Sequence, residues 1–119
     1  MPEFTIEKLS GSQPEIQILR LTGPFTLTGV FDFQEIVRSE PSPATVIDLA
    51  AVPYMDSAAL GSLLGLHVSC QRHNRKYALA NVTDRLKTLF RVAGVQSVLV
   101  ICPSLAEAEA TVGPSAASA

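Results

Sequence analysis

The sequence has no tryptophan, few other aromatic residues and no long apolar run. No uninterrupted apolar segment approaches the roughly 18 residues that a membrane-spanning helix requires. The N-terminal segment MPEFTIEKLS also lacks the basic start and the apolar stretch of a secretion signal. We therefore expect a cytoplasmic domain that does not insert directly into a membrane.

Charge of either sign is scarce. Nine lysines and arginines stand against eleven aspartates and glutamates, the formal net charge is −2, and neither sign forms a run. Nucleic-acid binding is not expected, because it needs a concentrated basic surface. Charged residues make up 17% of the chain and apolar residues 47%, so some apolar area should remain exposed for a protein partner.

The chain has only two cysteines, Cys70 and Cys102, and they do not form a Cys-x-x-Cys pair. We interpret them as reduced core residues rather than a disulfide. His67, Cys70 and His73 recur every three residues, but helix rotation spreads such positions and no fourth ligand is apparent, so we expect no metal site. The sequence also lacks a glycine-rich phosphate loop and a catalytic nucleophile-base set. These absences predict a protein that is not an enzyme and needs no cofactor.

Hydrophobic periodicity divides the chain into one domain, residues 1–112, and a small polar tail, 113–119, that we expect to be disordered. Alternating residues or short β-branched runs predict strands over 4–9, 15–21, 45–49, 76–81 and 97–101. Apolar residues three and four apart, with helix start and stop signals, predict helices over 26–37, 57 to 71 or 73, 84–93 and 104–112.

The order of these segments predicts the fold class. Two opening strands followed by alternating helices and strands indicate an α/β domain with a mixed sheet, whose opening pair is antiparallel and whose later strands are parallel, with about four helices. Thr83 or Asn81 is the expected N-cap of the third helix, and Ser104 with Glu107 matches a capping box at the fourth. Gly94 suits a left-handed helix end.

Asp56 and Ser57 lie where the central predicted strand leads into the longest predicted helix. Unpaired backbone N–H groups and the positive end of the helix dipole meet at such a point. A hydroxyl there can become a phosphate at modest electrostatic cost. By spacing alone, the same two residues also fit a simple N-cap.

Two other polar features have structural explanations. Asp48 lies inside an apolar strand, and we expect it near the strand end, where it accepts backbone or hydroxyl hydrogen bonds. Arg72, Arg75 and Lys76 are expected to form a solvated helix end that offsets the helix dipole.

Three stretches of the sequence carry a resemblance to a known family: Val46-Ile-Asp-Leu49, Tyr54-Met-Asp-Ser-Ala-Ala-Leu-Gly61, and Ala80-Asn-Val-Thr-Asp-Arg-Leu-Lys-Thr-Leu-Phe90 followed by Gly94. From about residue 3 to residue 112, the chain resembles the STAS domain, the fold of bacterial anti-sigma-factor antagonists. The resemblance implies that Ser57 is phosphorylated by a partner that is both an anti-sigma factor and a GHKL-type serine kinase. It further implies that only the unphosphorylated form binds this partner and releases a sigma factor, and that a serine phosphatase restores that form.

The same resemblance implies which residues contact the partner. They surround the phosphorylated serine and comprise Thr26, Met55, Asp56, Ser57, Ala58, Leu60 and Gly61. Two positions depart from the family pattern: Thr26 stands in Gly23-Pro-Phe-Thr26, where the family often has an aspartate, and Ala59 stands at the first glycine of the Asp-Ser-x-Gly-Leu-Gly turn.

Two alternatives belong to other functional classes. The domain could be a STAS subunit of a membrane transport complex that docks on the ATPase of that complex without being phosphorylated. It could also be a carrier of a small ligand or lipid, which would require a deep apolar cavity of several hundred Å³. A flat apolar patch at the helix start would instead favour a protein partner.

Overall fold

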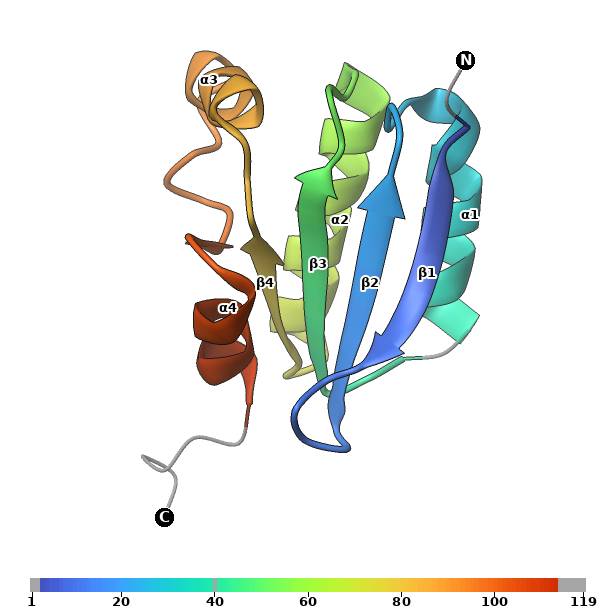
Figure 1. Ribbon diagram of the computed structural model, residues 1–119, viewed down its shortest axis with the longest axis vertical. Coiled ribbons are helices and arrows are strands. Elements are labelled where there is room, and N and C mark those ends of the chain that lie inside the picture. Colours follow the sequence, from blue (N-terminus) through green and yellow to red (C-terminus); the bar gives the residue numbers. More distant parts are fainter. Residues whose placement is uncertain (1–2, 40, 114–119) are drawn as a thin grey trace.

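One five-stranded sheet organises the computed structural model, which describes residues 3–39 and 41–113 (Figure 1). Its strands follow the chain order and are β1 (Thr5–Ser10), β2 (Ile16–Thr22), β3 (Ala44–Ala51), β4 (Lys76–Ala80) and β5 (Ile101–Cys102). The helices of the described part are α1 (Leu27–Ser39), α2 (Ser57–Arg72), α3 (Asp84–Val92) and α4 (Leu105–Val112). The pair β1–β2 is antiparallel and the later pairs are parallel. The predicted α/β fold with a mixed sheet is therefore confirmed.

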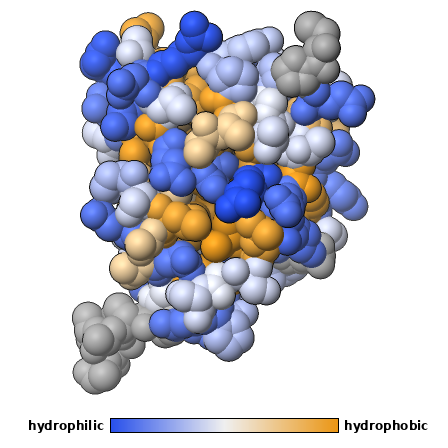
Figure 2. All heavy atoms as spheres, in the orientation of Figure 1, coloured by the Kyte–Doolittle hydropathy of each residue, from blue (hydrophilic) through white to orange (hydrophobic). Residues whose placement is uncertain are grey.

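The two faces of the sheet bury different side chains, because neighbouring residues of a strand point to opposite sides. On one face, α1, α2 and α3 cover a core that includes Leu21, Ile47, Leu63, Leu79 and Phe90. In Figure 1, α1 and α2 lie behind the sheet. On the other face, α4 covers a smaller cluster that includes Ile16, Ile18, Val46, Ala78 and Val112. Figure 2 shows apolar areas on the front face, interrupted by polar side chains.

The predicted caps set the ends of the later helices. Thr83 accepts a hydrogen bond from the backbone N–H of Leu86 at 3.3 Å, so Thr83, rather than Asn81, is the N-cap of α3. Ser104 accepts one from Glu107 at 3.1 Å at the start of α4. Gly94, just beyond α3, has a φ of 76°, as a left-handed helix end requires. Asn81 instead directly follows β4 and has a φ of 57°.

Two expectations concern the chain termini and the membrane. Of the tail predicted to be disordered, 113–119, all but Gly113 lies outside the described residues. Within the described part, the helices are too short or too polar to cross a membrane.

The predicted strand 97–101 is wrong over most of its length, because β5 contains only Ile101 and Cys102. The N–H groups of Val98 and Leu99 both bond to the carbonyl of Val95, which closes a turn instead of a strand ladder. The apolar run was misleading because Leu99 is buried by packing on the core, whereas Val98 is 44% exposed.

The Tyr77 hydroxyl fixes the segment just before β5. It accepts a hydrogen bond from the Val100 N–H at 3.1 Å and lies 2.7 Å from Nδ1 of His67 on α2. The Val100 N–H donates to the hydroxyl oxygen, and the direction of the bond between the hydroxyl and the His67 Nδ1 is set by the tautomer of that imidazole. Burial raises the pKa of Tyr77, an effect opposed by the Val100 hydrogen bond and reinforced by the charge of Cys70.

This hydroxyl predicts a loss of stability in alkali. A pKa that is higher in the folded than in the unfolded chain stabilises the fold below the unfolded value, and the benefit disappears as pH rises through the folded value. Burial also raises the pKa of Cys70. We expect the free energy of unfolding in urea to fall above about pH 9 to 10. Tyr77→Phe should be less stable at pH 7 because it loses two hydrogen bonds, but its alkaline fall should be shallower; parallel pH curves for the two proteins would contradict this account.

Candidate functional site

Two connections that are distant in the sequence lie side by side at the carboxyl end of the sheet. The link from β2 to α1 and the link from β3 to α2 pair through Phe25 and Met55. The Phe25 N–H donates to the Tyr54 carbonyl at 3.0 Å, and the Asp56 N–H donates to the Phe25 carbonyl at 3.2 Å. The starts of α1 and α2 are therefore held together by backbone hydrogen bonds.

Asp56 joins the two helix starts directly. Its Oδ1 accepts from the Ala59 N–H at 2.9 Å and caps α2, while its Oδ2 accepts from the N–H of Leu27, the first residue of α1, at 3.0 Å. The positive ends of two helix dipoles thus meet at one carboxylate. The predicted N-cap role of this position is confirmed, and the bond to the second helix was not anticipated from the sequence.

Ser57 is the first residue of α2, and its side chain is exposed. Gly61, one turn further along α2, is also exposed, and a Cβ added to it would meet nothing within 4 Å. Asp56 and Ala58 are partly exposed beside it, and so is Thr26 on the adjoining connection. The structure therefore leaves Ser57 open to solvent at the start of α2.

Two of the proposed partner-binding residues are not on this surface. Met55 is only 5% exposed and Leu60 only 7% exposed, and both belong to the main core. The expectation that they offer side chains to a partner is corrected here. The pairing of Met55 with Phe25 turns the Met55 side chain inward, and Leu60 lies on the side of α2 that faces the main core. They support the surface from beneath.

Exposed apolar side chains border the site. Leu27 is 58% exposed, Phe31 72% and Tyr54 46%. Leu27 adjoins Asp56 through its N–H, and Phe31 follows one turn later on α1. Neither Leu27 nor Phe31 was identified as a functional residue from the sequence. Their spacing of four residues, off the stripe of Val30, Phe33 and Val37, is the signal that could have revealed them.

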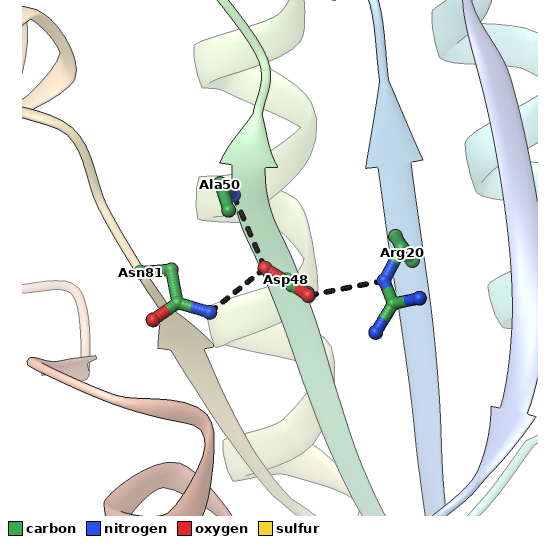
Figure 3. Close-up of polar contacts among 4 residues, drawn as sticks. All are labelled: Arg20, Asp48, Ala50 and Asn81. Atoms are coloured by element: carbon green, nitrogen blue, oxygen red, sulfur yellow. Dashed lines mark hydrogen bonds and ion pairs between the residues drawn. The ribbon is translucent and has the colours of Figure 1, made fainter.

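Asp48 forms a second polar cluster, on the other side of β3 from the main core (Figure 3). Its Oδ1 accepts from the Ala50 N–H and from the Asn81 amide, each at 3.1 Å, and its Oδ2 accepts from the Arg20 guanidinium at 3.2 Å. Asp48 lies within β3 rather than at its end, so the expected position was wrong, although the expected backbone hydrogen bond is present. The cluster balances a buried charge and links β2, β3 and the end of β4.

The three residues considered as metal ligands lie in different surroundings. His67 bonds to Tyr77, Cys70 is buried in the core, and His73 is exposed at the end of α2. Among the residues that the structure describes, no group of three histidines, cysteines or acids could hold a metal ion.

The hollow nearest to the site does not resemble a carrier cavity. It measures about 450 Å³, opens to solvent, and includes the acidic Glu3 and Asp32 as well as Phe4 and Tyr54 in its lining. An apolar ligand would not be enclosed there. The exposed apolar border of Ser57 fits a protein surface better.

The two hydrogen bonds that the Asp56 carboxylate accepts predict a large effect on stability. One N-cap contributes about 1 kcal/mol, so Asp56→Ala should lower the free energy of unfolding by about 2 kcal/mol, as measured by urea unfolding. Thr83→Ala removes a single cap from α3 and is the matched control. Asp56→Asn retains one acceptor oxygen, so its loss in the free energy of unfolding should lie between the losses for Asp56→Ala and Thr83→Ala. A loss for Asp56→Ala no greater than that for Thr83→Ala would show that the bond to α1 contributes nothing.

Comparison with known proteins places this arrangement in a family. Residues 10–108 match the STAS domain. The chain is 30% identical over 77 residues to the anti-sigma-B factor antagonist of Listeria monocytogenes, an alignment that spans 65% of this chain and 68% of the relative.

Solved structures share the fold at lower identity. An anti-sigma factor antagonist from Mycobacterium paratuberculosis superposes with a TM-score of 0.76 at 17% identity, covering 91% of this chain and 94% of that one. A sulfate transporter family protein from Wolinella succinogenes gives a TM-score of 0.68 at 18% identity, covering 85% of each chain. The fold alone therefore does not separate regulators from transport proteins. Together, the matching domain and the Listeria relative show that the chain belongs to the STAS family of anti-sigma-factor antagonists.

Proposed function

We propose that this protein binds an anti-sigma factor in the cytoplasm and that phosphorylation of Ser57 switches this binding off. The observation that carries the proposal is the exposed hydroxyl of Ser57 at the joined starts of α1 and α2, bordered by apolar side chains. The name of the Listeria relative, an anti-sigma-B factor antagonist, supports the choice of partner. The protein acts by binding, without catalysing a reaction itself.

The domain can hold a phosphate on Ser57 without unfolding. A phosphoserine adds about −1.5 to −2 charges and three acceptor oxygens. At the first position of α2, these oxygens lie near the backbone N–H groups that begin the helix and near the positive dipole end. Asp56 opposes the phosphate with its own negative charge, but that carboxylate is held by hydrogen bonds to Leu27 and Ala59.

The same phosphate is incompatible with a close apolar interface. In the unphosphorylated protein, a partner can close over a small hydroxyl between Ala58, Gly61 and the exposed Leu27 and Tyr54. Covering a doubly charged group there would strip its hydration without supplying a counter-charge. A penalty of about 3 kcal/mol reduces affinity roughly a hundredfold.

The kinase and the phosphatase complete the proposed cycle. The anti-sigma factor would itself be a GHKL-type serine kinase that transfers phosphate from ATP to Ser57. A serine phosphatase would return the protein to its binding form. Thr26, on the connection that pairs with the start of α2, would contact the kinase.

We expect charge at Ser57 to weaken partner binding while loss of the hydroxyl preserves it. Tagged wild-type, Ser57→Ala and Ser57→Asp proteins would be used to isolate partners from native cell extract, which are then identified by mass. Ser57→Ala should retain a GHKL-type ATPase and accept no phosphate, and Ser57→Asp should retain much less. Ser97→Asp, at an exposed serine in the turn before β5, is the matched control and should bind like the wild type.

Two results would contradict the proposal. A transporter ATPase retained equally by all four proteins would support the assembly-subunit alternative. Ser57 would then have only a structural role at the start of α2. Phosphate incorporated at Thr26 or Ser62 instead of Ser57 would show that the switch residue is misassigned; Ser62 is buried and donates to the Ala59 carbonyl.

A further inference from the structure

A second hollow lies toward the other end of α2, between α2, the edge of β4 and α4. This edge hollow measures about 300 Å³. Its lining consists of His67, Cys70, Gln71, Arg75, Lys76, Tyr77, Val100 and Thr111. It is independent of the switch proposed for Ser57, and it exists because β5 is too short to cover β4.

The short β5 leaves backbone groups of β4 unpaired. The Lys76 N–H donates to the Pro43 carbonyl, on the β3 side, and the Leu79 N–H donates to the Val100 carbonyl, on the β5 side. Because direction alternates along a strand, the N–H and C=O of Tyr77 point to the β5 side as well. There β5 pairs only with Leu79 and Ala80, and the Val100 N–H is taken by the Tyr77 hydroxyl. Neither backbone group of Tyr77 has a partner on that side among the described residues.

Positive charge collects at the same place. Arg72, Arg75 and Lys76 are three of the nine lysines and arginines of the chain, yet they lie within five consecutive residues. Arg75 and Lys76 line the edge hollow, and no acidic residue does. Of the described acids, none forms an ion pair with these three cations. Arg72 alone lies in the last turn of α2, so the helix dipole does not account for the other two.

The remaining wall is apolar or neutral. Tyr77 and Cys70 are buried, and Val100 is partly buried. Burial raises the pKa of the Cys70 thiol more than the charge of Arg75 lowers it, so the sulfur is a protonated contact surface rather than a nucleophile.

We propose that the edge hollow binds a small organic anion, with its acidic group at Arg75 and Lys76 and its apolar body against Tyr77, Cys70 and Val100. Small-molecule sites combine apolar walls with a few placed polar groups and begin at about 300 Å³. The Tyr77 N–H and the His67 imidazole supply directional partners. An added peptide strand fits less well, because on this edge the Arg75 N–H is bonded to the Cys70 carbonyl and the Leu79 N–H to the Val100 carbonyl, which leaves only Tyr77 between them.

Amide NMR titration of the full chain tests this site. The probes are benzoate and 3-methylbutanoate, with benzyl alcohol as the uncharged counterpart of benzoate. At least one anion should bind saturably at millimolar concentration and shift the amide signals of Tyr77, Val100 and Thr111. Arg75→Gln should weaken this binding about tenfold or more, because it removes a charged donor. Arg91→Gln, at an exposed arginine on α3, should leave it unchanged.

Other outcomes would overturn the assignment. They are the absence of saturable binding by both anions, equal binding of benzyl alcohol, or an equal loss in Arg91→Gln. Unchanged signal dispersion in Arg75→Gln would show that any loss reflects the site and not unfolding. Ser57→Asp should bind the anions like the wild type, so failure of the switch and failure of this site give different results.

Discussion

The structure around Ser57 depends on one carboxylate that bonds to two helices. Asp56 holds the N–H of Ala59 in α2 and the N–H of Leu27 in α1, and these bonds fix two connections that are about 30 residues apart in the chain. The hydroxyl of Ser57 therefore stands on a rigid base, beside exposed apolar side chains of both connections. A regulatory phosphate can then change the charge of a surface without changing the fold that carries it.

Much of this arrangement follows from local sequence rules. The alternating segments before residue 22 form the hairpin, the Asp-Ser pair marks the start of α2, and Thr83 and Ser104 cap α3 and α4 as expected. These features depend on residues within one helical turn or one hairpin of each other. Local patterns of hydrophobicity and capping are sufficient to specify them.

What the sequence did not reveal depends on contacts between distant segments. The bond from Leu27 to Asp56 and the burial of Met55 arise only when the two connections pair. In the segment predicted as strand 97–101, Val98 and Leu99 close a turn on the Val95 carbonyl, and the Tyr77 hydroxyl, 23 residues away, takes the Val100 N–H. The same shortening of β5 opens the edge hollow with its unpaired Tyr77 backbone, so the proposed switch residue lies at the start of α2 and the cationic hollow lies near its end.

The most direct test of the switch is the dissociation constant of the anti-sigma partner for the phosphorylated and unphosphorylated forms of this protein, measured by calorimetry. The phosphorylated form would be prepared with the partner kinase and ATP, and mass spectrometry would locate the phosphate. The account predicts one phosphate, on Ser57, and an affinity roughly a hundredfold lower than that of the unmodified protein. Equal affinities for the two forms, with Ser57 fully phosphorylated, would contradict it.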